Sequence, residues 1–536
     1  MSNNNRGGKR TGQANEERRL LKKGKRGILN VIFGRTMLVL LTLALQIALL
    51  VAIFSSLQSM QSMLPFYYAL LLLLYGAMIL HLVNKKSEPT TKITWILLVV
   101  LAPPVGLALY LFVEMDIGHR VLNRRLSEVM AETAVLLPDC AALPEAAAEA
   151  APELEGLVRY TWDHGRFPIY GNTAARYLPS GEDSLDAMLE DLSAAKDFIF
   201  MEFFIIDEGY MWGRVLKVLE DKVREGVEVR VMYDGTCALF RLPYRYPELL
   251  EGLGIQCKMF SPIRPMISAH YNNRDHRKIM VVDGRVAYTG GVNLADEYVN
   301  IGSRFGHWKD VSLRLEGEAV RGFTLMFLQM WNVDGNGDRY ARYLDAPAGG
   351  PVDAPGWVLP YGDSPLDDER VGEMVYLDII SRANRYVHIM TPYLILDSEM
   401  LTALTFAAKR GVEVVLMLPH IPDKKYAFAL AKTHYAELMQ AGVRIFEYTP
   451  GFVHAKVFVS DDCKAVVGTI NMDYRSFYLH FECAAYLRNT PAVADVEADF
   501  QATLAQCQEI TPEELKRIPL TTRLAGWLLK VVAPVM

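Results

Sequence analysis

The sequence predicts an α/β protein in which an N-terminal helical membrane region precedes two domains related by a pseudo-two-fold axis. Each domain is expected to have a mixed β-sheet flanked by helices. Three observations lead to this fold class: apolar segments lie within residues 36–114, β-type and helical segments alternate from residue 198 onwards, and a polar motif recurs at a fixed distance. The chain has 536 residues, which is more than a single hydrophobic core can support. Several domains are therefore expected.

The first 35 residues form a basic tail that we expect in the cytoplasm. They carry ten lysines and arginines against two glutamates, a net charge of +8; because the whole chain carries −6, the remainder carries −14. A basic tail before an apolar run is typical of contact with anionic membrane lipids, although a solvated tail that only fixes topology is the alternative. The acidic body argues against nucleic-acid binding. Six scattered cysteines without a CxxC pair indicate neither a disulfide framework nor a zinc site.

Residues 36–114 contain the expected membrane segments. Residues 36–57 are uncharged and long enough to span a bilayer, and 66–83 form a second span, so the two predict a helical hairpin with both ends in the cytoplasm. Residues 93–113 are also apolar, but Pro103-Pro104 at their centre breaks or kinks a helix, so this segment is either spanning or re-entrant. Basic residues just after it favour the re-entrant path. We therefore expect a multi-pass cell-membrane protein whose main body lies on the cytoplasmic face.

The remaining chain divides into four parts: a helical linker over 115–156, a first domain over 157–345, a second domain over 346–519 and a C-terminal amphipathic segment over 520–536. The last segment either lies at the membrane interface or packs on the body. Strand-type and helical segments alternate in both domains, which favours parallel strands in these stretches. They are 198–206, 212–225, 227–233 and 255–260 in the first domain, and 386–390, 400–410, 412–418 and 443–448 in the second.

A polar motif occurs once in each domain. A histidine is followed two residues later by lysine, five residues after that by aspartate, and further on by a glycine and an asparagine, and every copied position is offset by 178 residues. A single HxK pair is usually a surface feature, but a copy of the whole pattern is hard to explain by packing. The repeated positions are His276, Lys278, Asp283 and Asn293 in the first domain, and His454, Lys456, Asp461 and Asn471 in the second.

This pattern suits the chemistry of a phosphoryl group. In an extended segment alternate side chains share a face, so each histidine projects with its lysine. If the domains pack face to face, two imidazoles, two ammonium groups and the amides of Asn293 and Asn471 converge. Lysine charge and amide donors stabilise phosphate oxygens, one histidine attacks phosphorus, and the other acts as acid and base. Fixed cations replace a metal, so neither a metal nor another cofactor is expected.

The paired motifs resemble those of the phospholipase D superfamily, and the chain is similar to its bacterial cardiolipin synthases. The similarity extends over nearly the whole chain and is most specific in GTINMDYRSFYLHFE, residues 468–482. An extra N-terminal apolar segment departs from the usual two. The resemblance implies transfer of a phosphatidyl group between two phosphatidylglycerol molecules, which gives cardiolipin and glycerol through a covalent phosphohistidine.

The resemblance also implies roles for individual residues. It favours His276 as the nucleophile and His454 as the acid and base, although the symmetry of the motifs leaves the assignment open. Asp310 and Glu482 are expected to orient the histidines. The motif residues Asp283 and Asp461 are expected to be structural rather than to move protons. His480, close to Glu482 in sequence, is more typical of packing but could line a headgroup site.

Several alternatives remain within the superfamily. A phospholipase D hydrolase would share every catalytic residue, and a phosphatidylserine synthase-like transferase would use a cytidine-activated lipid. A nuclease would need a basic groove and no anchor, which the charge and the apolar segments contradict. An inactive membrane scaffold is disfavoured by two intact motifs. The expected partners are phosphatidylglycerol and anionic lipids, and the oligomeric state is left open.

Overall fold

The computed structural model describes residues 64–535, together with residues 48, 51 and 55. Within 64–535 it leaves out 102, 115–116, 138–144, 263–272, 303, 334, 336–339, 345–351 and 368. The predicted basic tail and nearly all of the predicted first span, 36–57, lie outside the described residues.

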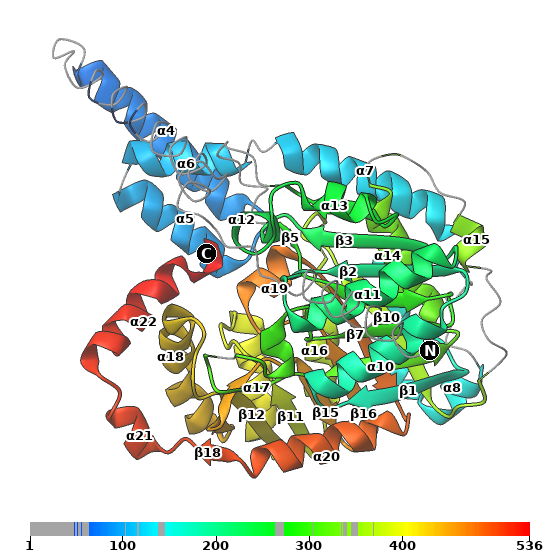
Figure 1. Cartoon of the computed structure of the whole chain (residues 1–536). Coiled ribbons are helices and arrows are strands. Elements are labelled where there is room, and N and C mark those ends of the chain that lie inside the picture. Colours follow the sequence, from blue (N-terminus) through cyan, green and yellow to red (C-terminus); the bar gives the residue numbers. More distant parts are fainter. Residues whose placement is uncertain are drawn as a thin grey trace, which may run out of the picture.

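The N-terminal part of the described chain is helical (Figure 1). Its helices are α4 (Leu64–Asn84), α5 (Pro89–Leu101), α6 (Pro103–Glu114), α7 (Ile117–Ala134), α8 (Glu145–Ala150), η2 (Pro152–Leu154) and α9 (Glu155–Gly165). The predicted break in 93–113 falls at Pro103, where α6 begins. Helix α6 packs closely on α5, because a Cβ atom on Gly106 would lie 2.4 Å from the carbonyl oxygen of Leu98.

The described helices do not meet the requirements of a membrane span. Within the described part of the chain, none combines sufficient length with sufficient apolar character to cross a bilayer. The predicted spans and the side of the membrane stay predictions.

The first domain contains a mixed seven-stranded sheet in the order β1-β9-β7-β6-β2-β3-β4. Its elements are β1 (Thr173–Leu178), α10 (Gly181–Ala194), β2 (Phe198–Phe203), α11 (Tyr210–Arg224), β3 (Glu228–Asp234), α12 (Cys237–Phe240), α13 (Tyr246–Glu251), β4 (Gln256–Phe260), β5 (Arg274–Asp275), β6 (Lys278–Val282), β7 (Val286–Gly290), η4 (Asp296–Val299), β8 (His307–Lys309), β9 (Ser312–Gly317), α14 (Val320–Trp331) and α15 (Tyr340–Leu344). Only β2, β3 and β4, which helical crossovers join, are parallel, and the other neighbouring pairs are antiparallel.

The second domain repeats this strand order as β10-β17-β16-β15-β11-β12-β13, with β18 added at the edge. Its elements are β10 (Trp357–Asp363), α16 (Val371–Arg382), β11 (Tyr386–Met390), α17 (Ser398–Lys409), β12 (Glu413–Pro419), α18 (Lys425–Ala441), β13 (Arg444–Tyr448), β14 (Gly451–Val453), β15 (Val457–Ser460), β16 (Lys464–Gly468), α19 (Tyr474–Tyr478), β17 (His480–Arg488), α20 (Ala492–Leu504), β18 (Cys507–Glu509), α21 (Pro512–Lys516), α22 (Leu520–Val532) and η5 (Ala533–Val535). The identical order confirms the predicted duplication of a mixed sheet.

The two domains contain three apolar cores, and the central one joins them. One outer core lies between the first sheet and helices α10 and α11, and another lies between the second sheet and helices α16 to α18. The central core combines residues of both sheets with α14 and α20, so that Phe200 and Phe323 of the first domain belong to the same cluster as Val457 and Phe500 of the second. The inner faces of the sheets are therefore fixed relative to one another.

The C-terminal segment packs on the body, which is one of the two arrangements that the sequence left open; a position at the membrane interface stays a prediction. Helix α22 packs on α18 at Gly526, where a Cβ atom would lie 2.6 Å from the carbonyl oxygen of Ala429. The other face of α22 leaves Leu524, Trp527 and Leu528 at least 46% exposed.

Candidate active site

Two short strand pairs cross between the domains and carry the two motif histidines. Strand β5 pairs in parallel with the start of β17, and β8 pairs in parallel with β14. Directly after these pairs, the backbone N–H of His276 donates to the carbonyl of Phe481 at 2.9 Å, and that of His454 donates to the carbonyl of Lys309 at 2.7 Å. Each histidine is thus positioned by the backbone of the opposite domain.

Each imidazole is also held by a carboxyl group of the opposite domain. His276 Nδ1 lies 3.0 and 2.9 Å from the two carboxyl oxygens of Glu482, and His454 Nδ1 lies 2.6 Å from Asp310 Oδ2. Both acids are fully buried, and both histidines are less than 9% exposed. An acid at Nδ1 fixes the orientation of the ring and leaves Nε2 for chemistry.

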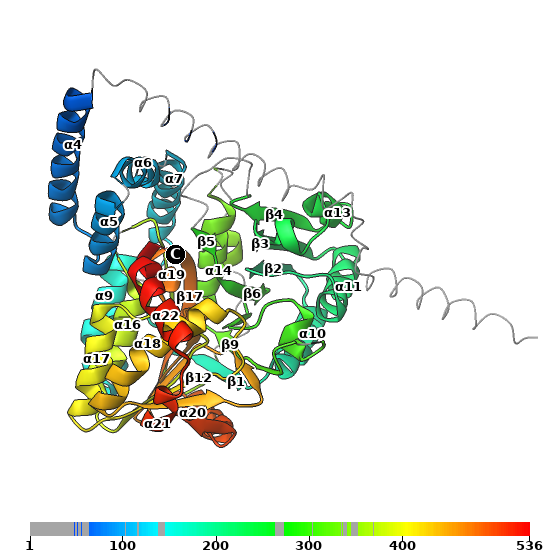
Figure 2. The ribbon, with the colours of Figure 1, turned by 90° about the vertical axis from the view of Figure 1, so that its left-hand side faces the viewer.

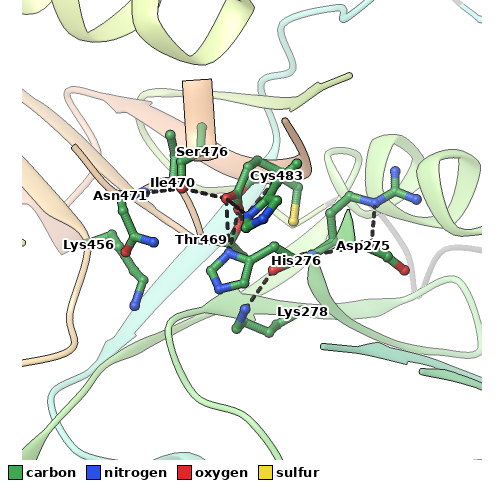
Figure 3. A network of polar contacts seen from close by, with 12 residues as sticks. Asp275, His276, Lys278, Lys456, Thr469, Ile470, Asn471, Ser476 and Cys483 are labelled. Carbon is green, nitrogen blue, oxygen red and sulfur yellow. Dashed lines mark hydrogen bonds and ion pairs between the residues drawn. The ribbon is translucent and has the colours of Figure 1, made fainter. Parts of the chain in front are cut away.

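Each motif lysine lies beside the histidine of its own motif, as Figure 3 shows for Lys278 and His276. Lys278 Nζ donates to the carbonyl of His276 at 2.6 Å, and Lys456 Nζ lies 2.9 and 3.0 Å from the ring nitrogens of His454. Figure 3 shows Lys278 and Lys456, one from each domain, near the His276 ring, and the charges of both lysines act on that ring. The structure therefore brings the four motif side chains into one small volume.

The surroundings of the two acids differ at positions that the repeat aligns. Gly291 leaves room for Asp310, because a Cβ atom there would lie 1.9 Å from Asp310 Oδ1. At the aligned position, Thr469 donates a hydroxyl hydrogen bond to Glu482. Ser476 donates a second hydroxyl bond to Glu482 at 2.7 Å. Thr469 and Ser476 are not among the site residues predicted from the sequence, although both lie in the 468–482 stretch.

The pKa values of Glu482 and Asp310 are shifted in opposite directions. Burial raises the pKa of Glu482 well above its usual range, against the opposing charge of Lys278. Burial acts in the same direction on Asp310, but His454 and Lys456 outweigh it and lower the pKa of Asp310. Asp310 is therefore the more fully charged partner of the two.

Burial lowers the pKa of both imidazoles. The pKa of His454 falls to about 4 through burial and the charge of Lys456, while Asp310 acts in the opposite direction. The pKa of His276 falls well below its usual range, first through burial and then through Lys278, with contributions from Lys456 and His454. These mutual effects mean that the motifs form one electrostatic site.

Burial lowers the pKa of both motif lysines as well, to about 8 for Lys278 and about 7 for Lys456. A buried ammonium group without a nearby anion is costly. A bound phosphate would supply that anion and favour the charged form of both lysines. The site is thus suited to an anionic ligand.

The two predicted phosphate-binding asparagines have different contacts. Asn293 Oδ1 accepts from the backbone N–H of Ile205 at 2.9 Å, and its Nδ2 donates to Tyr298 at 2.7 Å. Only one Nδ2 hydrogen of Asn293 is therefore left for a ligand. Asn471 Oδ1 is buried and has no hydrogen-bond partner among the described residues, so Asn471 is the more available of the two.

The motif aspartates lie at the far ends of β6 and β15 from the histidines. The carboxylate of Asp283 accepts three backbone N–H bonds, from Lys196, Asp197 and Phe198. Asp461 makes the same contacts with residues 384–386. Both have positive φ angles, 53° and 54°, as tight hairpin turns require. These contacts fit the structural role expected for the motif aspartates.

His480 lies closer to the centre than the sequence indicated. Its ring centroid is 5.4 Å from that of His276, and its two ring nitrogens have no hydrogen-bond partner among the described residues. Its nearness to His276 depends on the β5–β17 crossing, which sequence spacing does not reveal.

His276, His480 and Glu482 place ligand-type atoms within 4.8 Å of one another, as a metal site would. The ammonium group of Lys278 lies near the same cluster, because its charge acts on both His276 and Glu482. This positive charge attracts an anion and repels a metal cation. The charges therefore favour an anion over a metal ion. In chemical terms, the site offers two oriented imidazoles and two ammonium groups, a set that suits a phosphate.

Comparison with known proteins agrees with this geometry. Residues 188–302 and 376–504 match the family described as "Cardiolipin synthase, PLD-like domain", and residues 73–114 match that described as "Phospholipase_D-nuclease N-terminal". An uncharacterized protein of Streptococcus mutans is 49% identical over 85% of this chain and 99% of its own length. A cardiolipin synthase of Geobacillus kaustophilus is 33% identical over 86% of this chain and 92% of its own length.

A similar fold is found in a solved structure. The crystal structure of a phosphatidylserine synthase from Haemophilus influenzae superposes with a TM-score of 0.51 at 13% identity, covering 68% of this chain and 95% of that protein. At this identity the likeness concerns the fold.

Proposed function

The chain belongs to the cardiolipin synthase family of the phospholipase D superfamily, and we propose that it transfers a phosphatidyl group between two phosphatidylglycerol molecules. The products are cardiolipin and glycerol. The observation that carries the proposal is the pair of buried imidazoles, each held by an acid of the opposite domain and each accompanied by a lysine.

In the first step, Nε2 of His276 attacks the phosphorus of the donor lipid. A nitrogen–phosphorus bond forms, and the bond between phosphorus and the oxygen of the head-group glycerol breaks. His454 gives that oxygen a proton. Lys278 and Lys456 balance the charge that spreads over the phosphate oxygens in the transition state. The Nδ2–H group of Asn471 donates a hydrogen bond to the same oxygens.

The unequal acids support this division of roles. A general acid must carry a proton before it reacts, and the charge on Asp310 supports the protonated form of His454. A nucleophile must be neutral, and the pKa of His276 lies well below its usual range because of burial and Lys278. The bound phosphate raises the pKa of His454 towards the working range, since a nearby anion favours the imidazolium form.

In the second step, the terminal hydroxyl of another phosphatidylglycerol takes the place of glycerol. His454 removes the proton of this hydroxyl, and the hydroxyl oxygen attacks phosphorus. The nitrogen–phosphorus bond to His276 then breaks. One phosphodiester replaces another, so the reaction is nearly balanced in energy and excess glycerol should reverse it. Exclusion of water decides whether the enzyme transfers or hydrolyses.

We propose that the protein acts at the cell membrane as a multi-pass protein, with its two domains on the cytoplasmic face. The N-terminal match over residues 73–114 and the apolar sequence of 36–57, 66–83 and 93–113 support this location. A site held at the bilayer raises the local concentration of the lipid hydroxyl relative to its value in solution.

Product analysis tests the proposal. The purified full chain in detergent micelles receives phosphatidylglycerol alone, and lipids and glycerol are identified by mass spectrometry. Cardiolipin with an equal amount of glycerol supports the transferase. Phosphatidic acid with no cardiolipin would instead identify a phospholipase D hydrolase.

A further inference from the structure

A pocket close to the second motif contains two cations that form no direct ion pair with a described acid. Its empty volume is about 470 Å³, and its lining includes Lys424, Arg475, Tyr393 and Tyr474. In the described part of the chain, neither cation lies within 4 Å of a carboxylate oxygen; Lys424 Nζ instead lies 4.7 Å from the centre of the Tyr393 ring. Both side chains are exposed. Two acids are near them in sequence. Asp423 accepts the hydroxyl hydrogen bond of Tyr393 at 2.7 Å. Asp473, which also lines the pocket, is buried and accepts the backbone N–H of Ser476 at 2.8 Å.

His480 links this pocket to the catalytic centre. It lies next to His276, and its nitrogens are not used by the described residues. Its Nδ1 is 3.7 Å from Glu482 Oε1, beyond hydrogen-bond distance. Burial lowers the pKa of His480 well below its usual range, and the charges of Arg475, Lys278 and Lys424 add to this effect. A neutral imidazole thus lies within the field of the pocket cations on one side and of Lys278 on the other.

The proposed reaction requires a second anion site at such a place. The acceptor lipid carries its own phosphodiester, separated by one glycerol from the hydroxyl that attacks. When that hydroxyl reaches the phosphorus on His276, two negative phosphates lie close together and repel one another. Lys278 and Lys456 already serve the reacting phosphate, so the acceptor phosphate needs cations of its own.

We propose that Lys424 and Arg475 bind the phosphodiester of the acceptor lipid, while His480 contacts the glycerol between the two phosphates. This inference rests on the proposed function. A flexible lysine supplies a point charge and an arginine supplies a planar fork of donors, and both are suited to a phosphodiester. The chemistry recognised is a lipid phosphate with a free hydroxyl one glycerol away.

The position of the pocket suits a lipid acceptor. Ala533 of η5 and Leu430 of α18 complete its wall. The exposed apolar face of α22, with Leu524 and Trp527, adjoins η5, and Thr94 of α5 donates a hydrogen bond to the carbonyl of Val531 at 2.6 Å. Figure 2 shows α18, α19 and α22 together on the side of the molecule where α5 lies. Acyl chains could follow this apolar surface while the phosphate binds in the pocket.

A competition between two acceptors tests the assignment. The purified full chain in micelles receives phosphatidylglycerol and ethanol, and cardiolipin and phosphatidylethanol are measured together by mass spectrometry. Ethanol carries no phosphate and does not need the second site. We expect the ratio of cardiolipin to phosphatidylethanol to fall at least about tenfold in the Lys424→Ala/Arg475→Ala double variant, and about threefold or less in Arg475→Lys, which keeps the charge.

The matched control is Lys425→Ala, which removes an adjacent exposed lysine that does not line the pocket; its ratio should equal that of the wild type. An unchanged ratio in the double variant, or an equal loss of both products, would overturn the assignment. Added inorganic phosphate separates a lipid site from a free-phosphate site. If millimolar phosphate lowers the ratio in the wild type and more phosphatidylglycerol restores it, the two compete for one site and the assignment is supported. A decrease that more phosphatidylglycerol does not relieve, and that is absent from the double variant, overturns it. A wild-type chain that forms neither product would refute the proposed function itself.

Discussion

The most informative substitution is Asp310→Asn, which removes the charge beside His454 and keeps the shape of the side chain. Asp310 Oδ2 lies 2.6 Å from His454 Nδ1, and both residues are buried. Charges whose centres are roughly 4 Å apart interact by about 4 kcal/mol at an effective dielectric constant near 20. That energy corresponds to about three units in the pKa of His454. If His454 is the general acid, product formation should therefore fall about 1,000-fold.

Glu482→Gln is the matched variant at the other histidine. Burial raises the pKa of Glu482, so this carboxyl already holds its proton more readily than Asp310 does. A neutral amide of the same shape changes the charge less, and we expect a loss of about tenfold or less. Thr469 and Ser476 donate to different carboxyl oxygens of Glu482, so the amide oxygen can accept from one hydroxyl and the amide N–H can donate to the other.

A substrate with a better leaving group separates the roles. Nitrophenolate is a stable anion and needs no proton when it leaves. A phosphatidyl nitrophenol substrate should therefore restore the first turnover of Asp310→Asn, which would be measured as a rapid burst of nitrophenolate. The same substrate should not restore His276→Ala, because that variant lacks the nucleophile. A loss below tenfold in Asp310→Asn, or a burst that stays as slow as its turnover of phosphatidylglycerol, would refute the assignment of His454 as the acid.

Four further outcomes follow from the same geometry. His276→Ala and His454→Ala should each abolish cardiolipin formation while the protein stays in the membrane fraction, which cell fractionation and lipid analysis would check. EDTA should change the rate little, because fixed ammonium groups rather than a metal balance the phosphate charge; a strong loss that Mg²⁺ restores would contradict the mechanism. Asp283→Ala should lower the free energy of unfolding by about 1–3 kcal/mol, because three backbone N–H groups lose their acceptor; thermal unfolding measures this, and an unchanged Tm would count against the turn role. Above pH 8 the KM for lipid should rise, because Lys456 and Lys278, with pKa values of about 7 and 8, lose their charge as the pH increases; a KM that falls between pH 7 and 9 would oppose this reading.

The repeat made much of the site predictable from sequence. Matches offset by 178 residues identified His276 and His454 as a pair, and a two-residue spacing in an extended segment brought a lysine to each. The strand-type segment 386–390 coincides with β11, and the predicted helix over 212–225 corresponds to α11 at Tyr210–Arg224. These features depend on local spacing and on repetition, which a sequence displays directly.

The remaining features depend on the contact between the domains. No local pattern indicates that β5 pairs with β17, so the nearness of His480 to His276 could not be derived from spacing. The different contacts of Asn293 and Asn471 also arise after folding, because Tyr298 and Ser476 stand at aligned positions but bind different groups. The expectation of parallel strands applied only where helices link them, since β6, β7 and β9 are antiparallel.

The crossed strands explain why the duplication is kept within one chain. His276 takes its backbone contact and its carboxyl partner from the second domain, and His454 takes both from the first. A single domain would therefore present a histidine with neither its acid nor the second lysine, and its ring would be free to turn. The repeat alone would make the two histidines equivalent, and either one could then take the role of nucleophile or of acid, depending on which of them held the shared proton. The exchange of Gly291 for Thr469, and of Asp310 for Glu482, removes that equivalence and leaves one neutral imidazole facing one that a charged carboxylate supports.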